Sequence, residues 1–210
     1  GYTDLNKAIT ESSDTFFYQT AFNLGIDRFS MWMKRFGFGM PTGIEIPEEA
    51  AANMPRKEWK QKRYKKPWVP GDTIHVGIGQ GYWTATPLQV AKATSIVVNN
   101  GKIHTPHLMK SVEGSIIEPY QDPLLYEDIT DPKQAYWDAA KRGMFNVVNS
   151  GAGTGRKAFV GTNYHVAGKS GTAQVFSLKE NQKYNAAGLK KELHDHAWFT
   201  DYAPYEDPKL

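Results

Sequence analysis

The stretch from Val166 to Val175, VAGKSGTAQV, constrains the fold of this chain more than any other. Aromatic and β-branched residues stand on both sides of it, which predicts a β-strand. Strand alternation places Lys169 and Gly171 on one face of that strand. Ser170 and Thr172 then lie on the other face. A positive charge, two hydroxyls and a glycine that lets a second backbone approach are suited to holding a carboxylate or an oxyanion. We therefore interpret this strand as the wall of a cleft for an anionic ligand.

Two simpler interpretations compete with that one. A glycine-lysine-serine sequence occurs in phosphate-binding P-loops, but a P-loop needs a glycine five residues before Gly168, where Asn163 stands. It also needs a helix to follow, whereas residues 172–176 are predicted to be extended. A plain edge strand is the second alternative, and only the rest of the chain distinguishes it from a binding strand.

Positive charge is concentrated in one segment. Seven Lys or Arg and one Glu lie between Arg56 and Lys66, which gives this segment a net charge of +6. The whole chain carries +3, so the remainder carries −3. Tryptophan and tyrosine interleave with the basic residues, a composition used by surfaces that bind RNA, anionic lipid or another polyanion. A solvated helix or loop face is the alternative, and the modest total charge does not indicate nucleic acid as a partner.

The composition excludes several classes of protein. With 40% hydrophobic and 13% aromatic residues, the 210-residue chain can bury a core. It has no cysteine, which rules out disulfides and thiolate metal sites. Residues 1–210 contain no apolar run of about 18 residues and no signal peptide, but because we expect the chain to be a piece of a longer protein, this says nothing about the location of that protein. His194-Asp195-His196 is a weak candidate for metal binding, and we expect no metal site because no other ligand cluster accompanies it.

The N-terminal sequence predicts three short helices. Thr3 or Asp4 caps the first, residues 15–24 form the second, and the third starts near Asp27. Ser12-Ser13-Asp14 therefore lies on the connection between two core helices. Its hydroxyls and carboxylate either point into a cleft or cap the next helix, which is the usual role of Ser and Asp at such positions.

The remaining elements are predicted from caps, periodicity and glycines. Thr86 and Pro87 start a helix whose many apolar residues should be buried, and a further helix starts at Asp131-Pro132. The other predicted segments are short strands or extended stretches at 42–47, 102–112 and 196–202, a glycine-punctuated apolar stretch at 71–83, a flexible turn at 151–155, and a polar helical or mobile stretch at 177–193.

Taken together, these pieces resemble class B penicillin-binding proteins, the D,D-transpeptidases that cross-link peptidoglycan. Such enzymes carry the signatures S-x-x-K, S-D-N and K-T-G. Lys169-Ser170-Gly171 is similar to the third, with serine for threonine. Ser12-Ser13-Asp14 is similar to the second, with Asp14 where asparagine is commoner. The segment Gly77–Ala93, GIGQGYWTATPLQVAKA, resembles the helix-leading motif between them. Further stretches are similar to the elongation-specific subclass, and the resemblance covers nearly the whole chain.

The first signature is missing from the chain. None of its nine serines has a lysine three positions later. The family places the nucleophilic serine and its lysine N-terminal to the Ser-x-Asn element, so we expect both to precede Gly1. Residues 1–210 are accordingly expected to be a single partial transpeptidase domain that lacks the nucleophile segment and the last strand and helix, and that is inactive alone.

The resemblance implies catalytic roles for three residues. Ser12 would pass a proton between the missing lysine and the leaving or attacking amine. Asp14 would accept a hydrogen bond from a substrate amide or the missing lysine, and its charge could raise the pKa of that lysine or be neutralised by Lys169. Lys169 would supply positive charge to the substrate carboxylate and to the proton relay.

Three further residues are implied to bind substrate. The hydroxyls of Ser170 and Thr172 would hold the terminal carboxylate, and the Thr172 backbone N–H would be one oxyanion donor. Gly171 would let the substrate backbone lie against the strand. The resemblance implies neither a cofactor nor a metal.

The implied fold is mixed α/β (α+β), the penicillin-binding transpeptidase or serine β-lactamase-like fold, with an antiparallel sheet, helices on both faces, and the strand at 164–176 as the cleft wall. The implied partners are peptidoglycan stem peptides, lipid-linked precursor strands, β-lactam antibiotics, a membrane glycosyltransferase and elongation-complex proteins, and no nucleic acid. The implied location is the periplasmic face of the bacterial inner membrane, with an anchor outside this chain.

Two alternative functions stay open. A serine β-lactamase-like hydrolase is disfavoured by the insertion at 177–196 and by the Gly77–Ala93 motif, which resembles the transpeptidases. A non-catalytic cell-wall binding module is permitted by the basic segment.

Overall fold

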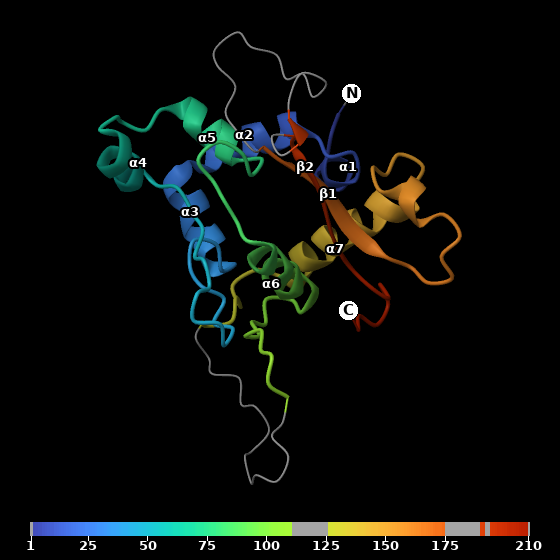
Figure 1. Cartoon of the computed structure of the whole chain (residues 1–210). Coiled ribbons are helices and arrows are strands. Elements are labelled where there is room, and N and C mark those ends of the chain that lie inside the picture. The colour runs from blue at the N-terminus through green and yellow to red at the C-terminus, as the bar shows by residue number, and fades with distance from the viewer. Residues whose placement is uncertain (1, 111–125, 175–189, 192–193, 210) are drawn as a thin grey trace, which may run out of the picture.

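The computed structural model describes residues 2–110, 126–174, 190–191 and 194–209 (Figure 1). Helices α3 and α4 form the left of that view, and the two strands lie nearer its centre with α1 and α7 beside them. No helix in these ranges is long and apolar enough to cross a membrane. The elements, in chain order, are α1 (Leu5–Thr10), α2 (Asp14–Leu24), α3 (Ile26–Arg35), α4 (Lys57–Tyr64), α5 (Pro70–Val76), α6 (Pro87–Val98), α7 (Gln134–Asn149), the 3-10 helix η1 (Arg156–Phe159), β1 (Ala167–Ala173) and β2 (His196–Tyr202).

The first three helices form where caps and glycines predict them. The side chain of Asp4 accepts a hydrogen bond from the Lys7 backbone N–H at 2.8 Å and so begins α1. Gly25 has a φ of +73°, which glycine adopts readily, and it separates α2 from α3. These two helices and α5 share a core cluster whose buried members are Ala21, Ile26, Phe29 and Val76.

Helix α6 begins at the predicted cap, but it buries a different set of residues. Thr86 and Gln89 form a capping box at its start. Its buried residues are Gln89, Lys92 and Ile96, so the prediction of an apolar buried helix is only partly right. The Gln89 amide donates to two backbone carbonyls, and the Lys92 ammonium donates to the Thr42 carbonyl at 2.9 Å. These partners explain why the two polar side chains can be buried.

The two strands pair antiparallel along their whole length, with Lys169 opposite Thr200. Gly168 permits this close pairing, because a Cβ there would lie 2.6 Å from both the Thr200 carbonyl oxygen and the Phe199 ring. Helix α7 packs along β1, and α6 packs along β2. Met144 of α7, Ala167 of β1 and Tyr202 of β2 form one core cluster, which fixes the sheet on the helices.

The structure corrects one predicted strand. Residues 42–47 form none, because the Glu49 carboxylate accepts hydrogen bonds from the Thr42 and Gly43 backbone N–H groups and so replaces a strand partner. The described part of the 102–112 stretch, for which only an extended chain is predicted, contains no strand. There the Ile103 N–H donates to the Asp128 side chain instead of to a neighbouring strand.

Two further boundaries differ from the predictions. The glycine-punctuated stretch at 71–83 begins within a helix, α5, which starts with Pro70 at its first turn and with Asp72 accepting the Val69 N–H. Within the described part of the predicted 164–176, β1 occupies Ala167–Ala173, because its length is set by pairing with β2. Most of the 177–193 stretch lies outside the described residues.

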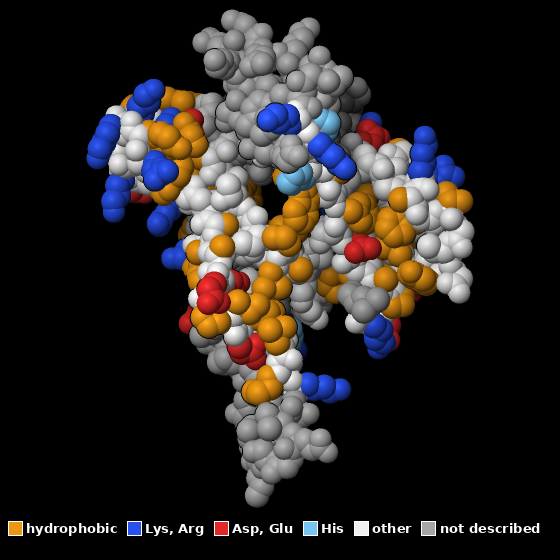
Figure 2. Space-filling view, in the orientation of Figure 1, with side chains coloured by type: hydrophobic (Ala, Val, Ile, Leu, Met, Phe, Trp, Pro, Cys, Tyr) orange, Lys and Arg blue, Asp and Glu red, His pale blue; other side chains and the backbone are white. Residues whose placement is uncertain are grey.

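The basic segment forms α4 and its flanks, and Figure 2 shows Lys and Arg side chains gathered there. Lys60 is the exception: it is 5% exposed, and its ammonium pairs with the carboxylate of Asp72. The rings of Trp68 and Tyr82 lie within 5.9 and 5.5 Å of the same ammonium. The segment is therefore a mostly solvated basic face that one buried lysine attaches to α5.

Candidate active site

The turn between α1 and α2 holds Ser12 in an unusual backbone conformation. Ser12 has a φ of +56°, in the left-handed region that residues other than glycine seldom adopt. Backbone hydrogen bonds from Ser12 to Ile9 (3.3 Å) and from Ser13 to Ala8 (2.9 Å) close the turn. A conformation of this kind costs about 1 kcal/mol or more and often marks a functional position. Packing of α1 against α7 supports the turn.

Helix capping does not account for the hydroxyls of this turn. Ser13 stands at the N-cap of α2, but its side chain forms no capping hydrogen bond and lies instead 3.3 Å from the Thr15 hydroxyl. Asp14 is the exposed first residue of α2. Within the described ranges its carboxylate has no hydrogen-bond or ion-pair partner, so its influence on neighbouring groups is through charge.

Lys169 of β1 joins this turn to the sheet. Its ammonium donates hydrogen bonds of 2.8 Å to the Ser12 hydroxyl oxygen and of 2.8 Å to the Ser170 carbonyl. An ammonium can only donate, so Ser12 accepts in this contact and keeps its own proton for another partner. The two signatures that lie far apart in the sequence therefore meet through one direct contact.

Two opposing effects act on the charge of Lys169. The side chain is part-buried, and burial lowers the pKa of its ammonium from the ordinary lysine value. The nearby charge of Asp14 acts in the opposite direction and favours the protonated form. Burial and the Asp14 carboxylate thus shift the pKa of the same ammonium in opposite directions, and perturbed pKa values of this kind are common at functional sites.

The three predicted substrate-binding residues follow Lys169 along β1. The Ser170 hydroxyl lies 2.8 Å from the Thr154 hydroxyl and 3.4 Å from the Lys169 ammonium. Gly171 and Thr172 are exposed, so this end of the strand is open to a ligand. Sequence reasoning missed Thr154, whose glycine-rich surroundings indicated only a turn.

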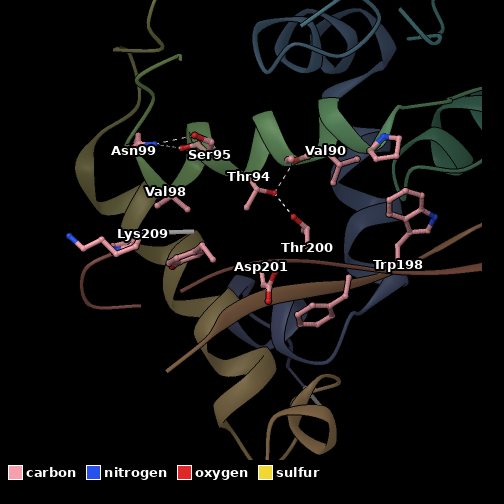
Figure 3. A pocket seen from close by; sticks show the side chains of 14 residues that line it. Val90, Thr94, Ser95, Val98, Asn99, Trp198, Thr200, Asp201 and Lys209 are labelled. Carbon is pink, nitrogen blue, oxygen red and sulfur yellow. Dashed lines mark hydrogen bonds between the residues drawn. The ribbon is translucent and has the colours of Figure 1, made fainter. Parts of the chain in front are cut away.

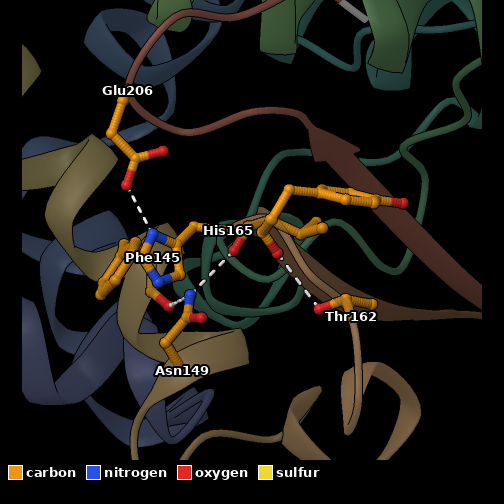
Figure 4. A network of polar contacts seen from close by, with 7 residues as sticks. Phe145, Asn149, Thr162, His165 and Glu206 are labelled. Atoms are coloured by element: carbon orange, nitrogen blue, oxygen red, sulfur yellow. Dashed lines mark hydrogen bonds and ion pairs between the residues drawn. The ribbon is translucent and has the colours of Figure 1, made fainter.

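Hydrogen bonds outside the site hold the start of β1 in place (Figure 4). The Asn149 amide at the end of α7 donates to the Val166 carbonyl at 2.9 Å. The His165 ring contacts the Glu206 carboxylate at 2.5 Å. The Tyr205 N–H donates to the His165 carbonyl at 2.9 Å. These contacts tie the strand that carries Lys169 both to α7 and to the segment that follows β2.

A pocket of about 490 Å³ lies between α6 and β2, away from these residues (Figure 3). The hydroxyls of Thr94 and Thr200, 2.8 Å apart, join the two elements there. None of the predicted site residues lines this pocket. Its walls are packed structural elements, and we assign it no part in the chemistry.

A lysine-bearing strand that faces a serine turn, on a small antiparallel sheet packed with helices, is the arrangement expected of a penicillin-binding transpeptidase domain. The sequence profile of the penicillin binding protein transpeptidase domain matches residues 1–210, and the chain belongs to this family. It is 79% identical over 210 residues to the peptidoglycan D,D-transpeptidase MrdA of Haemophilus influenzae, covering all of this chain and 32% of that protein. It is 48% identical over 215 residues to MrdA of Escherichia coli K12, covering all of this chain and 33% of that protein. The chain thus spans about a third of the length of these relatives.

Solved structures agree on the fold. The chain superposes on Pseudomonas aeruginosa PBP2 in complex with WCK 5153 with a TM-score of 0.85 and 41% identity, over 99% of this chain and 43% of that one. It superposes on Helicobacter pylori PBP2 in complex with MreC with a TM-score of 0.81 and 34% identity, over 100% of this chain and 35% of that one. The predicted family and the predicted mixed α/β transpeptidase fold are confirmed.

Proposed function

We propose that this chain is the C-terminal part of the catalytic domain of a peptidoglycan D,D-transpeptidase that works in cell-wall elongation. The hydrogen bond between the Lys169 ammonium and the Ser12 hydroxyl supports this proposal most directly. It brings the second and third transpeptidase signatures to one site, as a shared proton relay requires. The 79% identity to a peptidoglycan D,D-transpeptidase over the whole chain supports it independently.

The proposed reaction has two steps. A serine outside residues 1–210 attacks the carbonyl carbon of the D-Ala-D-Ala bond, and the terminal D-alanine leaves as its nitrogen takes up a proton. An amine of a neighbouring stem peptide then attacks the acyl carbon, loses a proton and displaces the serine oxygen, which is reprotonated. Ser12 lies where it can pass these protons, because its hydroxyl accepts from Lys169 and its own proton remains available.

The open end of β1 is the proposed seat of the substrate terminus. The Ser170 and Thr172 hydroxyls donate to the terminal carboxylate, whose charge Lys169 neutralises in part. The Thr172 N–H points to the carbonyl oxygen that becomes negative, a contact typically worth about 3 kcal/mol in the transition state. Gly171 leaves room for the substrate backbone. A β-lactam presents the same carboxylate and a reactive carbonyl, and it acylates the same serine.

Asp14 is proposed to tune this site by charge. It raises the pKa of Lys169 against the effect of burial and so keeps the ammonium protonated where a carboxylate has to bind. The neutral asparagine that is commoner at this position would lack that effect. The proposal gives a reason for Asp14 that is independent of any direct contact with the substrate.

The proposed partners follow from the relatives. One solved neighbour is H. pylori PBP2 in complex with MreC, and another, with 29% identity and a TM-score of 0.76, belongs to a peptidoglycan synthase complex that coordinates polymerization and crosslinking. We infer that the protein carrying this chain acts with a membrane glycosyltransferase and elongation proteins at the periplasmic face of the bacterial inner membrane. Its substrates there are stem peptides on lipid-linked precursor strands.

Labelled penicillin tests this function in the full-length protein. We expect one covalent adduct that is released slowly, whereas fast release would favour the rival β-lactamase-like hydrolase. Ser12→Ala and Lys169→Met should each reduce the acylation rate by about 10²- to 10⁴-fold, the usual contribution of a proton-transfer group. Lys102→Met, which removes an exposed lysine outside the site, is the matched control and should leave the rate unchanged. Unchanged acylation in the Lys169 variant would contradict the proposed role of Lys169, and no acylation of the unsubstituted full-length protein would instead support a non-catalytic binding module.

A further inference from the structure

Thr154 contacts a proposed substrate-binding residue directly. Its hydroxyl oxygen lies 2.8 Å from the hydroxyl oxygen of Ser170, and either atom could be the donor. Thr154 is exposed and lies in the glycine-rich loop between α7 and η1, 16 residues before Ser170. Neither transpeptidase signature in this chain includes it.

The loop that carries Thr154 is a close-packed structure. The Gly155 N–H donates to the Val147 carbonyl of α7 at 2.9 Å. A Cβ at Gly153 would lie 2.2 Å from the same carbonyl oxygen, and a Cβ at Gly155 would lie 3.0 Å from the Phe199 ring of β2. The Thr154 N–H also reaches the Thr10 carbonyl at the end of α1, at 3.4 Å. Contacts with α1, α7 and β2 therefore fix the position of the Thr154 hydroxyl.

The chemistry of the bound ligand decides which of the two hydroxyls donates a hydrogen bond to the other. A bound carboxylate is only an acceptor, so Ser170 must donate its single proton to it. Ser170 can then contact Thr154 only as an acceptor, and Thr154 becomes the donor. The Lys169 ammonium, 3.4 Å from the Ser170 oxygen, is also a donor and does not compete for that proton. The chain Thr154 to Ser170 to carboxylate consists of two aligned hydrogen bonds, each of which polarises the other.

We propose that Thr154 is a positioning residue for substrate recognition. By donating to Ser170, it holds that hydroxyl with its proton directed at the terminal carboxylate. The proposal rests on the proposed function, since it takes Ser170 as part of the carboxylate site. It predicts a defect confined to ligands that carry a free carboxylate.

The test compares two ligands in the full-length protein: a labelled penicillin and its carboxyl methyl ester. Second-order acylation rate constants are measured for the unsubstituted protein and for Thr154→Val, which keeps the shape and removes the hydroxyl. We expect the valine variant to lose about 3- to 10-fold in its rate with the free acid, the usual net worth of one hydrogen bond, and to keep its rate with the ester. Thr154→Ser retains the hydroxyl and should retain the preference for the acid.

Control variants separate positioning from folding. Thr162→Val removes another exposed threonine hydroxyl, which among the described residues bonds to the carbonyls of Phe159 and Tyr164, and it should change neither rate. Three outcomes would each overturn the role of Thr154. The valine variant could lose acylation rate equally with acid and ester, it could lose none with either, or the serine variant could be as impaired as the valine variant. Absence of any acylation in the unsubstituted protein would overturn the proposed function, and this inference with it.

Discussion

The ammonium of Lys169 donates a 2.8 Å hydrogen bond to the hydroxyl of Ser12, a residue 157 positions earlier in the chain. The contact joins β1 to the turn between α1 and α2, whose left-handed residue is Ser12 itself. Neither element is stabilised in this position by the contact alone, because α7 packs on both α1 and β1. Helix α7 is therefore the support that brings the two halves of the site together.

Replacement of Asp14 by asparagine should change the pH dependence of the site. Burial lowers the pKa of Lys169 and the charge of Asp14 raises it, so Asp14→Asn lowers that pKa further. The cation holds a carboxylate only while protonated, and binding is lost as the pH rises through its pKa. The alkaline limb of the penicillin acylation rate should therefore move to lower pH in the variant. A limb that stays in place or moves to higher pH would contradict the charge role of Asp14.

Two glycines of β1 should respond differently to alanine. Gly168→Ala places a Cβ 2.6 Å from the Thr200 carbonyl oxygen and should lower the free energy of unfolding by about 2 kcal/mol. At Gly171 the nearest atom to such a Cβ is the Trp198 Cβ at 3.7 Å, an ordinary contact, so Gly171→Ala should change stability by less than about 0.5 kcal/mol. The Gly171 variant should nevertheless be acylated more slowly, because its methyl group occupies the proposed substrate path. Thermal unfolding and penicillin acylation measure the two effects separately.

Two lysines of the basic segment allow the stability contributed by a buried ion pair to be compared with that of an exposed one. Lys60→Met leaves the Asp72 carboxylate buried without its cation and should cost about 3 kcal/mol of unfolding free energy. Lys57→Met breaks the exposed pair with Asp27 and should cost less than about 1 kcal/mol. Denaturant unfolding of the two variants provides the comparison. Similar losses in both would mean that the buried pair is not what anchors α4 to α5.

Residues 1–210 alone should form no covalent adduct with labelled penicillin. None of the nine serines is followed three positions later by a lysine, so no residue of the chain matches the nucleophile signature. Gel fluorescence and intact mass measurement after incubation with the drug check this. A stoichiometric adduct on Ser12 or any other serine of this chain would show that the nucleophile lies within it.

Local signals sufficed for most of the helices. The cap at Asp4, the break at Gly25 and the capping box at Thr86 act over three or four residues, and the sequence displays them directly. Helix α5 carried the same kind of signal, with Pro70 at its first position and Asp72 accepting the Val69 N–H. Its glycine-rich continuation obscured that signal.

Strand ends and site contacts depend on distant residues. β1 ends where pairing with β2 ends, and the 42–47 stretch forms no strand because Glu49 satisfies its backbone. The family resemblance assigned Ser12 and Lys169 to one active site, but their direct contact was not predicted, since no local rule joins residues so far apart. Thr154 was missed for the same reason: its role arises from a partner on another element, while its neighbours are turn residues.

A crystal structure of the full-length protein acylated by a penicillin tests the central claim most directly. Our account predicts that the drug carboxylate lies within about 3.2 Å of the Ser170 and Thr172 hydroxyls, with Ser12 and Lys169 lining the same groove beside the acylated serine. A drug bound covalently elsewhere, or one whose carboxylate faces away from β1, would contradict it.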